Sequence, residues 1–224
     1  MGPGSSGSGA GNGGSGNASV QSANVTVTAT GDGMTIETRA SALLSSGLGF
    51  TGSVPSSDAG DVIVIERYGP RTDWTWEPTA QATVASNGTF AAVWQTNHIG
   101  QFSIRAVLDS GGAATASASP GLPTVTVTVY RPSVATLYGP GFWGRRTACG
   151  VVLGRGTIGV ANRTLPCGTP VAVYYNGRSV VLPVIDRGPY ANGADWDLTM
   201  AAGRVLGIDT TVTVGAVSLP RSGA

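Results

Sequence analysis

Segments in which apolar and polar residues alternate recur along most of the chain, and this period of two constrains the fold more than any other feature. The alternation is clear in "NVTVTAT", "DVIVIERYG", "TFAAVWQT" and "TVTVTVY", and turn sequences such as "GDG", "SNG" and "SGG" lie between such segments. A strand with one buried face produces this pattern, whereas a helix produces a period near 3.6. The chain is therefore predicted to be all-β.

Residues 18–131 contain most of these segments and no long helical one, which predicts an antiparallel, immunoglobulin-like β-sandwich. Its predicted core residues are Phe90, Trp94, Phe102, Ile104 and Val107. This part gathers no catalytic groups, so it is interpreted as a spacer or as a module that binds a protein partner.

Residues 132–220 form a second predicted module, in which Gly-rich turns separate short strands. Pro132 is predicted to end the last strand of the sandwich. One helix is predicted in "LTMAAGRVLG", where apolar residues recur at helical spacing and Gly207 suits the C-terminal stop. Asp197, just ahead of it, is expected to cap this helix or to interact with its dipole.

The ends of the chain are predicted to lie outside both modules. Residues 1–17 are rich in Gly and Ser, which predicts a flexible linker or tag, and residues 221–224 are predicted to be a tail. The start lacks the basic and apolar regions of a signal peptide, so an export signal is expected to be absent from this chain. No apolar run approaches the ~20 residues of a membrane helix.

Charge is sparse and balanced. Charged residues make up 11% of the chain, and all 13 basic residues are Arg. The net charge of +1 favours neither nucleic acid nor an anionic membrane as a partner. Residues 18–131 hold five Arg against eight Asp or Glu, and residues 132–220 hold seven Arg against four Asp, which predicts modules of opposite mild charge.

The cysteines are Cys149 and Cys167, and the single histidine, His98, lies far from them in the sequence. Two cysteines cannot hold zinc without further ligands, and neither a metal nor another cofactor is predicted. In a chain so rich in Ser, Thr and Gly, the pair favours one disulfide in an exported protein. Two inert thiols in a cytosolic protein are the alternative.

Three segments carry a family resemblance: "ATLYGPGFWGRRTACG", "GVANRTLPCGTPVAVYYNGRSVVLPVIDRGPY" and "DWDLTMAAGRVLG". In this order they resemble the rare lipoprotein A (RlpA) family of septal-ring lytic transglycosylases, over about residues 134–219. The cysteines in "TACG" and "LPCG", with a β-rich domain ahead of them, resemble the actinobacterial-type branch. The resemblance implies a six-stranded double-psi β-barrel with one short helix, and the barrel is more distantly similar to expansins and family 45 endoglucanases.

The resemblance also implies a secreted or envelope-associated bacterial protein with a groove for peptidoglycan strands. Members of the family cleave between muramic acid and glucosamine without water and leave an anhydro sugar. The reaction needs a group that protonates the leaving oxygen and a group that takes a proton from the sugar's own hydroxyl. One carboxyl with a raised pKa can serve both steps.

Two family positions are altered in this chain. The motif "TANGE" is "TACGV" here, so Val151 replaces its Glu, and in "VANRTLP" Asn162 replaces the His of "AAHKTLP". Neither Val nor Asn titrates in the useful range. Asp186, the Asp of "DRGP", is the remaining candidate catalytic residue, and its alternative is a structural role as acceptor for the turn "RGPY".

Aromatic and Arg side chains in two Gly-rich loops complete the candidate site. Sugar faces stack on aromatic rings, and sugar hydroxyls bond planar polar groups such as Asn, Asp and Arg. The predicted glycan-binding residues are Tyr138, Phe142, Trp143, Arg145, Arg146, Asn162, Arg187, Tyr190, Asp195 and Trp196. A plain aromatic core and a solvated basic face are the alternatives.

Three functions remain open from the sequence. The first is a peptidoglycan lytic transglycosylase that uses Asp186 and a rearranged partner. The second is a non-catalytic glycan-binding or wall-loosening module, and the third is a structural surface protein. The altered Glu and His positions favour the last two on chemical grounds, whereas the family fold favours the first.

Overall fold

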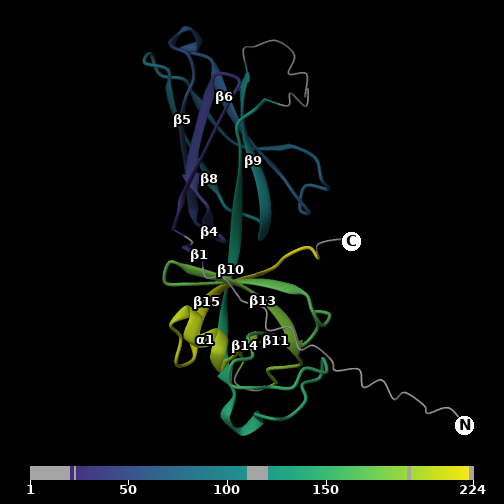
Figure 1. Cartoon of the computed structure of the whole chain (residues 1–224). Coiled ribbons are helices and arrows are strands. Elements are labelled where there is room, and N and C mark those ends of the chain that lie inside the picture. Colours follow the sequence, from purple (N-terminus) through teal and green to yellow (C-terminus); the bar gives the residue numbers. More distant parts are fainter. Residues whose placement is uncertain (1–20, 23, 110–120, 191–192, 222–224) are drawn as a thin grey trace, which may run out of the picture.

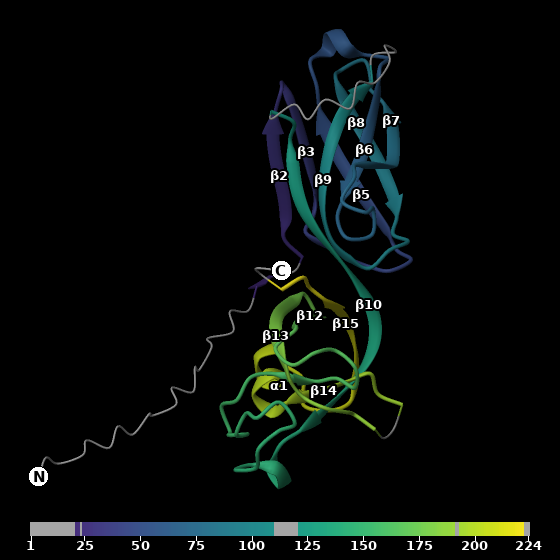
Figure 2. The same cartoon turned by 90° about the vertical axis from the view of Figure 1, so that its right-hand side faces the viewer.

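The computed structural model describes residues 21–22, 24–109, 121–190 and 193–221, which form two β-rich parts stacked end to end (Figures 1 and 2). The strands of the first part are β2 (Thr26–Gly31), β3 (Met34–Arg39), β4 (Ser41–Leu43), β5 (Gly47–Ser53), β6 (Val62–Tyr68), β7 (Glu77–Thr83), β8 (Thr89–Gln95), β9 (Gly100–Asp109) and the first half of β10 (Thr124–Tyr138). The remaining elements are β1 (Gln21–Ser22), β11 (Val160–Ala161), β12 (Pro170–Tyr175), β13 (Arg178–Asp186), β14 (Trp196–Thr199), α1 (Met200–Leu206) and β15 (Val212–Ser218), with short 3-10 turns at Ser56–Asp58 and Pro140–Phe142.

The first part is a sandwich of two sheets around one core. One sheet has the order β2–β3–β5–β8, and the other has the order β4–β10–β9–β6–β7. Residues of both sheets alternate between the core and solvent, so that Trp94 of β8 meets Phe102 of β9 edge to face, with ring centroids 5.8 Å apart. The predicted sandwich is confirmed, and its immunoglobulin-like type stays a prediction.

One predicted core residue is wrong. Val107 lies on the outer face of β9, because Phe102, Ile104 and Ala106 occupy the inward positions of that strand. Side chains of a strand alternate between its two faces, so the residue after the inward-facing Ala106 faces outward.

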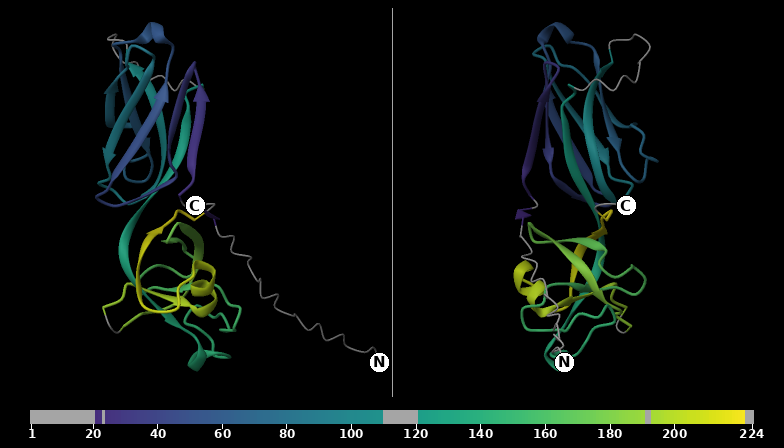
Figure 3. Two further views of the ribbon diagram at one scale, coloured as in Figure 1. Left: turned by 90° about the vertical axis from the view of Figure 1, so that its left-hand side faces the viewer. Right: turned by 45° about the vertical axis from the view of Figure 1, so that its right-hand side comes forward.

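The second part is a closed barrel of six strands (Figure 3). Going around the barrel, the order is β10, β15, β12, β13, β11 and β14, and β14 pairs with β10 to close it. The β10–β14 and β11–β13 pairs are parallel and the others are antiparallel. Val173, Leu182 and Leu198 are buried inside with α1 packed against them. The predicted barrel with one short helix is confirmed.

The helix α1 begins at a different cap from the predicted one. Thr199 is the N-cap, and its hydroxyl oxygen accepts a hydrogen bond from Ala202 N at 3.2 Å. Asp197 lies two residues earlier, inside β14, so its predicted capping role is wrong. The predicted stop is confirmed, because Gly207 takes the left-handed conformation, with φ 77°, that favours glycine at this position.

Strand β10 belongs to both parts and passes straight through Pro132, which the sequence predicted to end it. Its first half pairs with β9 and β4, and its second half pairs with β15 and β14. Pro132 lies opposite Gly215, at a point where the other edge of β10 has left β4 and has not yet met β14. An unpaired edge tolerates proline, since no ladder bond needs its missing N–H.

Two further contacts join the parts. Tyr130 of β10 is buried against Ala172 and Val217 of the barrel, and its ring lies 5.6 Å from that of Tyr174. Ile99, between β8 and β9, packs on the same small cluster. In addition, β1 pairs with β13, so the first described residues lie on the barrel before the chain enters the sandwich.

Candidate functional site

A β-hairpin spanning residues 144–153 lies beside the end of β13. Its two arms are joined by Gly144 N–H to Leu153 O at 2.8 Å and by Leu153 N–H to Arg145 O at 2.9 Å. Thr147 N–H bonds Val151 O at 2.8 Å, which leaves the residues between them as the tip. The hairpin therefore has a defined shape although it is short and rich in glycine.

Asp186, the last residue of β13, anchors the tip of this hairpin. Its Oδ1 accepts the backbone N–H of Ala148 at 2.9 Å and that of Arg187 at 2.8 Å. Asp186 is half-buried, and its Oδ2 accepts no hydrogen bond from a described residue. The carboxylate thus positions two loops and keeps one oxygen available.

The Cys149–Cys167 disulfide joins the hairpin tip to the turn that precedes β12, with the Cα atoms 5.6 Å apart. The predicted disulfide is confirmed. The Arg187 guanidinium lies over it, with Nη2 3.5 Å from Cys167 Sγ. Arg187 is therefore occupied by the disulfide and by its own turn rather than extended toward solvent.

Asp197 of β14, a strand separated from β13 by β11, is a second carboxylate in this region. Its Oδ1 accepts the Thr136 hydroxyl at 2.9 Å. Burial raises the pKa of Asp197, and the negative charge of Asp186 raises it further, while the Thr136 hydrogen bond acts in the opposite direction. A half-buried carboxyl with a raised pKa can hold a proton that an ordinary Asp would lose.

Tyr138, at the end of β10, completes this cluster of titratable groups. Its hydroxyl is buried and has no hydrogen-bond partner among the described residues. Burial raises the pKa of Tyr138, and the charges of Asp186 and Asp197 raise it further, so the phenol stays neutral. Residues of three barrel strands, β10, β13 and β14, thus bring one phenol and two carboxyls within electrostatic reach of one another.

Comparison with known proteins identifies the second part of the chain. Residues 133–218 match the family described as "Lytic transglycolase". The chain is 44% identical over 96 residues to the "Probable endolytic peptidoglycan transglycosylase RlpA" of Synechocystis sp., a match that covers 42% of this chain and 30% of the relative. Residues 133–218 are therefore similar to RlpA proteins, and this part is called the RlpA-like domain.

Two other similar proteins extend the comparison. The "Endolytic peptidoglycan transglycosylase RlpA" of Campylobacter jejuni is 26% identical over 171 residues, which cover 75% of this chain and 54% of the relative. This chain therefore spans only part of the curated relatives it matches. Among solved structures, the Streptomyces papain inhibitor is 25% identical and has a TM-score of 0.33, over 40% of this chain and 93% of the inhibitor.

The two altered family positions of the RlpA-like domain both lie near Asp186. Val151 is in the hairpin that Asp186 anchors, and its side chain is partly exposed. Asn162 donates its backbone N–H to Asp186 O at 3.2 Å, and its Oδ1 accepts the N–H of Leu165 at 2.9 Å and that of Thr164 at 3.1 Å. Asn162 therefore closes a turn, where a His would have offered a titratable ring.

The aromatic residues ahead of the hairpin lie partly on the surface of the domain. Phe142 is 52% exposed, and its ring meets that of Tyr138 edge to face at 6.3 Å. Trp143 is half-buried, and the guanidinium of Arg155 lies 4.4 Å from the centroid of its ring. The Trp143 ring is thus partly covered by a cation that the sequence did not single out.

The two predicted Arg residues of the hairpin differ in their side-chain hydrogen bonds. Arg145 is exposed and makes no ion pair with a described residue. Arg146 is also exposed, but its Nη1 donates to Gly150 O at 2.8 Å across the hairpin. Both can meet a ligand carboxylate, Arg146 only by giving up or sharing this bond.

The loop after β13 contributes fewer surface groups than predicted. Tyr190 is 79% exposed and remains a candidate ligand contact. Trp196 belongs to the barrel core with its ring buried, so the structure does not support its predicted sugar contact. Asp195 Oδ2 accepts Val134 N–H at 3.2 Å, and Oδ1 lies 3.9 Å from Arg163 Nη2, which favours a structural role. Asn192, a further candidate for hydrogen bonds to sugar hydroxyls from the sequence, lies outside the described residues.

Asp197 and Thr136 are the site residues that sequence reasoning missed. The alternation of "WDLT" was the available signal, because it places Asp197 on a strand rather than at a helix end. The described residues contain no group of three or more His, Cys, Asp or Glu arranged to hold a metal ion. In the same part of the chain, no helix is long and apolar enough to cross a bilayer.

Proposed function

We propose that this protein acts on the glycan strands of bacterial peptidoglycan as a lytic transglycosylase, with Asp197 as its acid and base. The observation that carries the proposal is the half-buried Asp197 carboxyl bonded to Thr136, whose pKa is raised by burial and by the charge of Asp186. The names of the relatives support the same reaction class. Asp186 has a supporting role, because its charge adds to the effect of burial in raising the pKa of Asp197 and its carboxylate holds the hairpin.

The proposed reaction breaks the bond between C1 of the muramic acid and the oxygen of the next glucosamine. Protonated Asp197 donates its proton to that leaving oxygen. The Asp197 carboxylate then takes the proton of the muramic acid's own C6 hydroxyl, whose oxygen bonds C1 and closes the anhydro ring. One carboxyl thus completes the cycle in its original protonation state, which explains how a site with Val151 and Asn162 at the altered positions can act.

The negative charge of Asp186 has a second consequence in this proposal. Positive charge develops at C1 as the glycosidic bond breaks, and a nearby carboxylate stabilises it. Tyr138 is neutral and its hydroxyl has no partner among the described residues, so it can orient toward either carboxyl.

A location outside the cytoplasm follows from the proposed substrate. Peptidoglycan lies outside the cytoplasmic membrane, and the Cys149–Cys167 disulfide is stable in an oxidising compartment. We therefore propose that the protein is exported and associated with the cell envelope. The groove, the actinobacterial-type relationship and a protein partner for the sandwich stay predictions.

A non-catalytic glycan-binding function is the second candidate. It is favoured by one observation, which is that Val151 and Asn162 provide no proton-transfer group at the two altered family positions. In that case the exposed Phe142, Tyr190 and Arg145 would bind strands without cleaving them.

The test is incubation of the full chain with denuded glycan strands, followed by mass spectrometry for anhydromuropeptides. We expect product from the wild type and a loss of about 100-fold or more in Asp197→Asn, because removal of the acid and base has a cost of that order. Asp209→Asn is the matched control, since Asp209 is the exposed fourth carboxylate of the domain. Equal product from Asp197→Asn contradicts the assignment, and binding without product from the wild type identifies the second candidate.

A further inference from the structure

A second group of aromatic side chains lies on the sandwich, far in sequence from the barrel site. Tyr68 ends β6, and Trp74 and Trp76 lie in the loop that leads to β7. The Tyr68 ring centroid is 5.5 Å from that of Trp74, with 60° between the planes, and 5.3 Å from that of Trp76. The three rings, here called the sandwich platform, are therefore one contiguous array.

Arg105 of β9 supports one end of the sandwich platform. Its guanidinium lies 4.1 Å from the centroid of the Trp76 ring, and its Nε donates to Glu66 Oε2 at 2.7 Å. The Arg105 side chain is only 7% exposed. Because a paired guanidinium stacks on this ring, Trp76 and the Tyr68 ring beside it are held in place.

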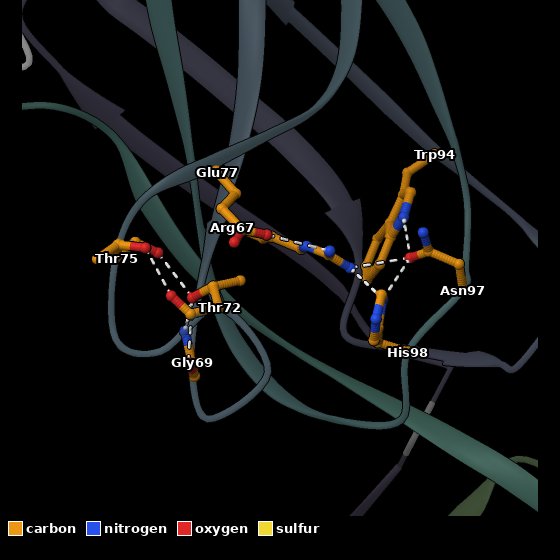
Figure 4. Close-up of polar contacts among 8 residues, drawn as sticks. All are labelled: Arg67, Gly69, Thr72, Thr75, Glu77, Trp94, Asn97 and His98. Carbon is orange, nitrogen blue, oxygen red and sulfur yellow. Dashed lines mark hydrogen bonds and ion pairs between the residues drawn. The ribbon is translucent and has the colours of Figure 1, made fainter.

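Hydrogen bonds within the loop fix its path (Figure 4). The Thr72 hydroxyl oxygen accepts Gly69 N–H at 3.1 Å, and the same hydroxyl donates to Thr75 O at 2.6 Å. The Thr75 hydroxyl donates to Thr72 O at 2.6 Å. At the far end of the loop, Arg67 Nη2 donates to Glu77 Oε2 at 3.3 Å. The loop is thus bound internally and at its end.

Trp74 is exposed on this rigid loop although its backbone conformation is unfavourable. Its side chain is 55% exposed, its φ is 57°, and the preceding Asp73 has φ 48°. The left-handed region is uncommon for bulky residues and is maintained only where the surroundings impose it. The loop therefore holds an indole ring in solvent at a conformational cost.

The sandwich platform has no role in the core. Ile63 and Ile65 of β6 point into the sandwich, whereas Glu66 and Tyr68 lie on the opposite face. None of the three rings belongs to a hydrophobic core cluster of the described residues. No Val, Leu or Ile of β6, β7, β9 or this loop is strongly exposed, so the apolar surface here is aromatic rather than aliphatic.

A sugar fits this surface better than a protein partner does. An exposed indole face accepts the C–H face of a pyranose ring, and protein interfaces need a broader apolar area than one exposed ring supplies. Arg71 and Asp73, which precede Trp74 by three residues and by one, are exposed and offer groups for hydroxyls. Arg71 makes no ion pair with any described residue, which leaves it free to meet a carboxylate of a ligand.

We propose that Tyr68, Trp74 and Trp76 form a second glycan-binding site, which binds a β-linked N-acetylhexosamine strand by stacking a sugar on Trp74. That the strand is peptidoglycan rests on the proposed function, whereas the site itself needs no catalysis. It would anchor the protein to the same polymer on which the barrel acts.

The test compares binding of full-length variants to two probes. The probes are purified insoluble peptidoglycan, by co-sedimentation, and soluble N-acetylglucosamine hexamer, by calorimetric titration. We expect Trp74→Ala to weaken both affinities about threefold to tenfold, because one aromatic stack has that effect, and Trp74→Phe to retain most of the binding. Val93→Ala is the control, since Val93 is 59% exposed on the opposite sheet.

Unchanged binding by Trp74→Ala, or no binding of either probe by the wild type, would overturn the proposal. A change in sedimentation from dimer to monomer in Trp74→Ala would also overturn it, by showing that a second copy covers the ring. Loss of binding in Trp74→Ala, with no anhydro product from the wild type, would support this site and reject the transglycosylase function. The two proposals therefore fail separately.

Discussion

At the scale of single residues, the electrostatics of Asp197 depend on three neighbours with different effects. Burial disfavours its charged form, Asp186 adds negative charge nearby, and the Thr136 hydroxyl stabilises the charge by a hydrogen bond at 2.9 Å. The first two prevail, so the pKa of Asp197 is raised.

The raised pKa predicts a pH-dependent difference in stability between the wild type and Asp197→Asn. The folded wild type binds the Asp197 proton more tightly than the unfolded chain, so its free energy of unfolding falls as the pH rises from the ordinary pKa of Asp through the raised one. Asn keeps an acceptor for Thr136 and does not titrate. We expect the variant to be more stable than the wild type above this range and to lose that advantage below it.

Thermal unfolding of both proteins across this pH range measures the effect. Asp209→Asn serves as the control, because Asp209 is exposed at the start of the loop to β15. If the stability difference between the wild type and Asp197→Asn is the same at every pH, the surroundings do not raise the pKa of Asp197.

At the scale of elements, the alternating pattern predicted most strands correctly because each strand carries its own period of two. It could not predict where strands continue: Pro132 stands inside β10, where an unpaired edge removes its cost. Nor did it separate the end of β14 from the start of α1, because "DLT" contains two residues able to cap a helix, Asp197 and Thr199. Asp197 was misassigned for this reason, and the candidate site was predicted without it.

The disulfide should govern the stability of the hairpin and of the turn before β12. Cys149 and Cys167 are 18 residues apart in sequence, and a bridge closing such a loop contributes about 3 kcal/mol. We expect the Cys149→Ser, Cys167→Ser double variant to lose about that free energy of unfolding in denaturant titrations. The wild type in reductant should then match the variant, and a wild type that is unaffected by reductant would contradict the prediction.

At the scale of the whole molecule, closure of the barrel was implied by family resemblance rather than by any local pattern. The β10–β14 pairing joins residues about sixty positions apart, and no periodicity signals such a contact. The same limit applies to the junction between the parts, where Tyr130, Tyr174 and Ile99 meet. The sequence did not indicate the sandwich platform either. This candidate site is defined by the exposure of its rings and by the contacts between them, which no sequence pattern shows.

The shared strand and the Tyr130 cluster predict that the two parts unfold together. In hydrogen exchange at increasing denaturant, β5 and β12 should lose protection at the same concentration in the wild type. Tyr130→Ala should lower that concentration and separate the two losses, because removal of a buried aromatic ring costs about 3–5 kcal/mol at the junction. Separate losses in the wild type would contradict this prediction, and Tyr190→Ala, at a ring that is 79% exposed, is the control.

Strand β10 is 15 residues long and leaves no linker between the sandwich and the barrel. A flexible tether would let two sugar sites find ligands at any separation, whereas a hydrogen-bonded strand keeps them at one separation and one angle. Affinity for oligosaccharides would then rise abruptly at the length that spans both sites, instead of growing smoothly with each added sugar. The protein would then bind long glycan strands in preference to short ones.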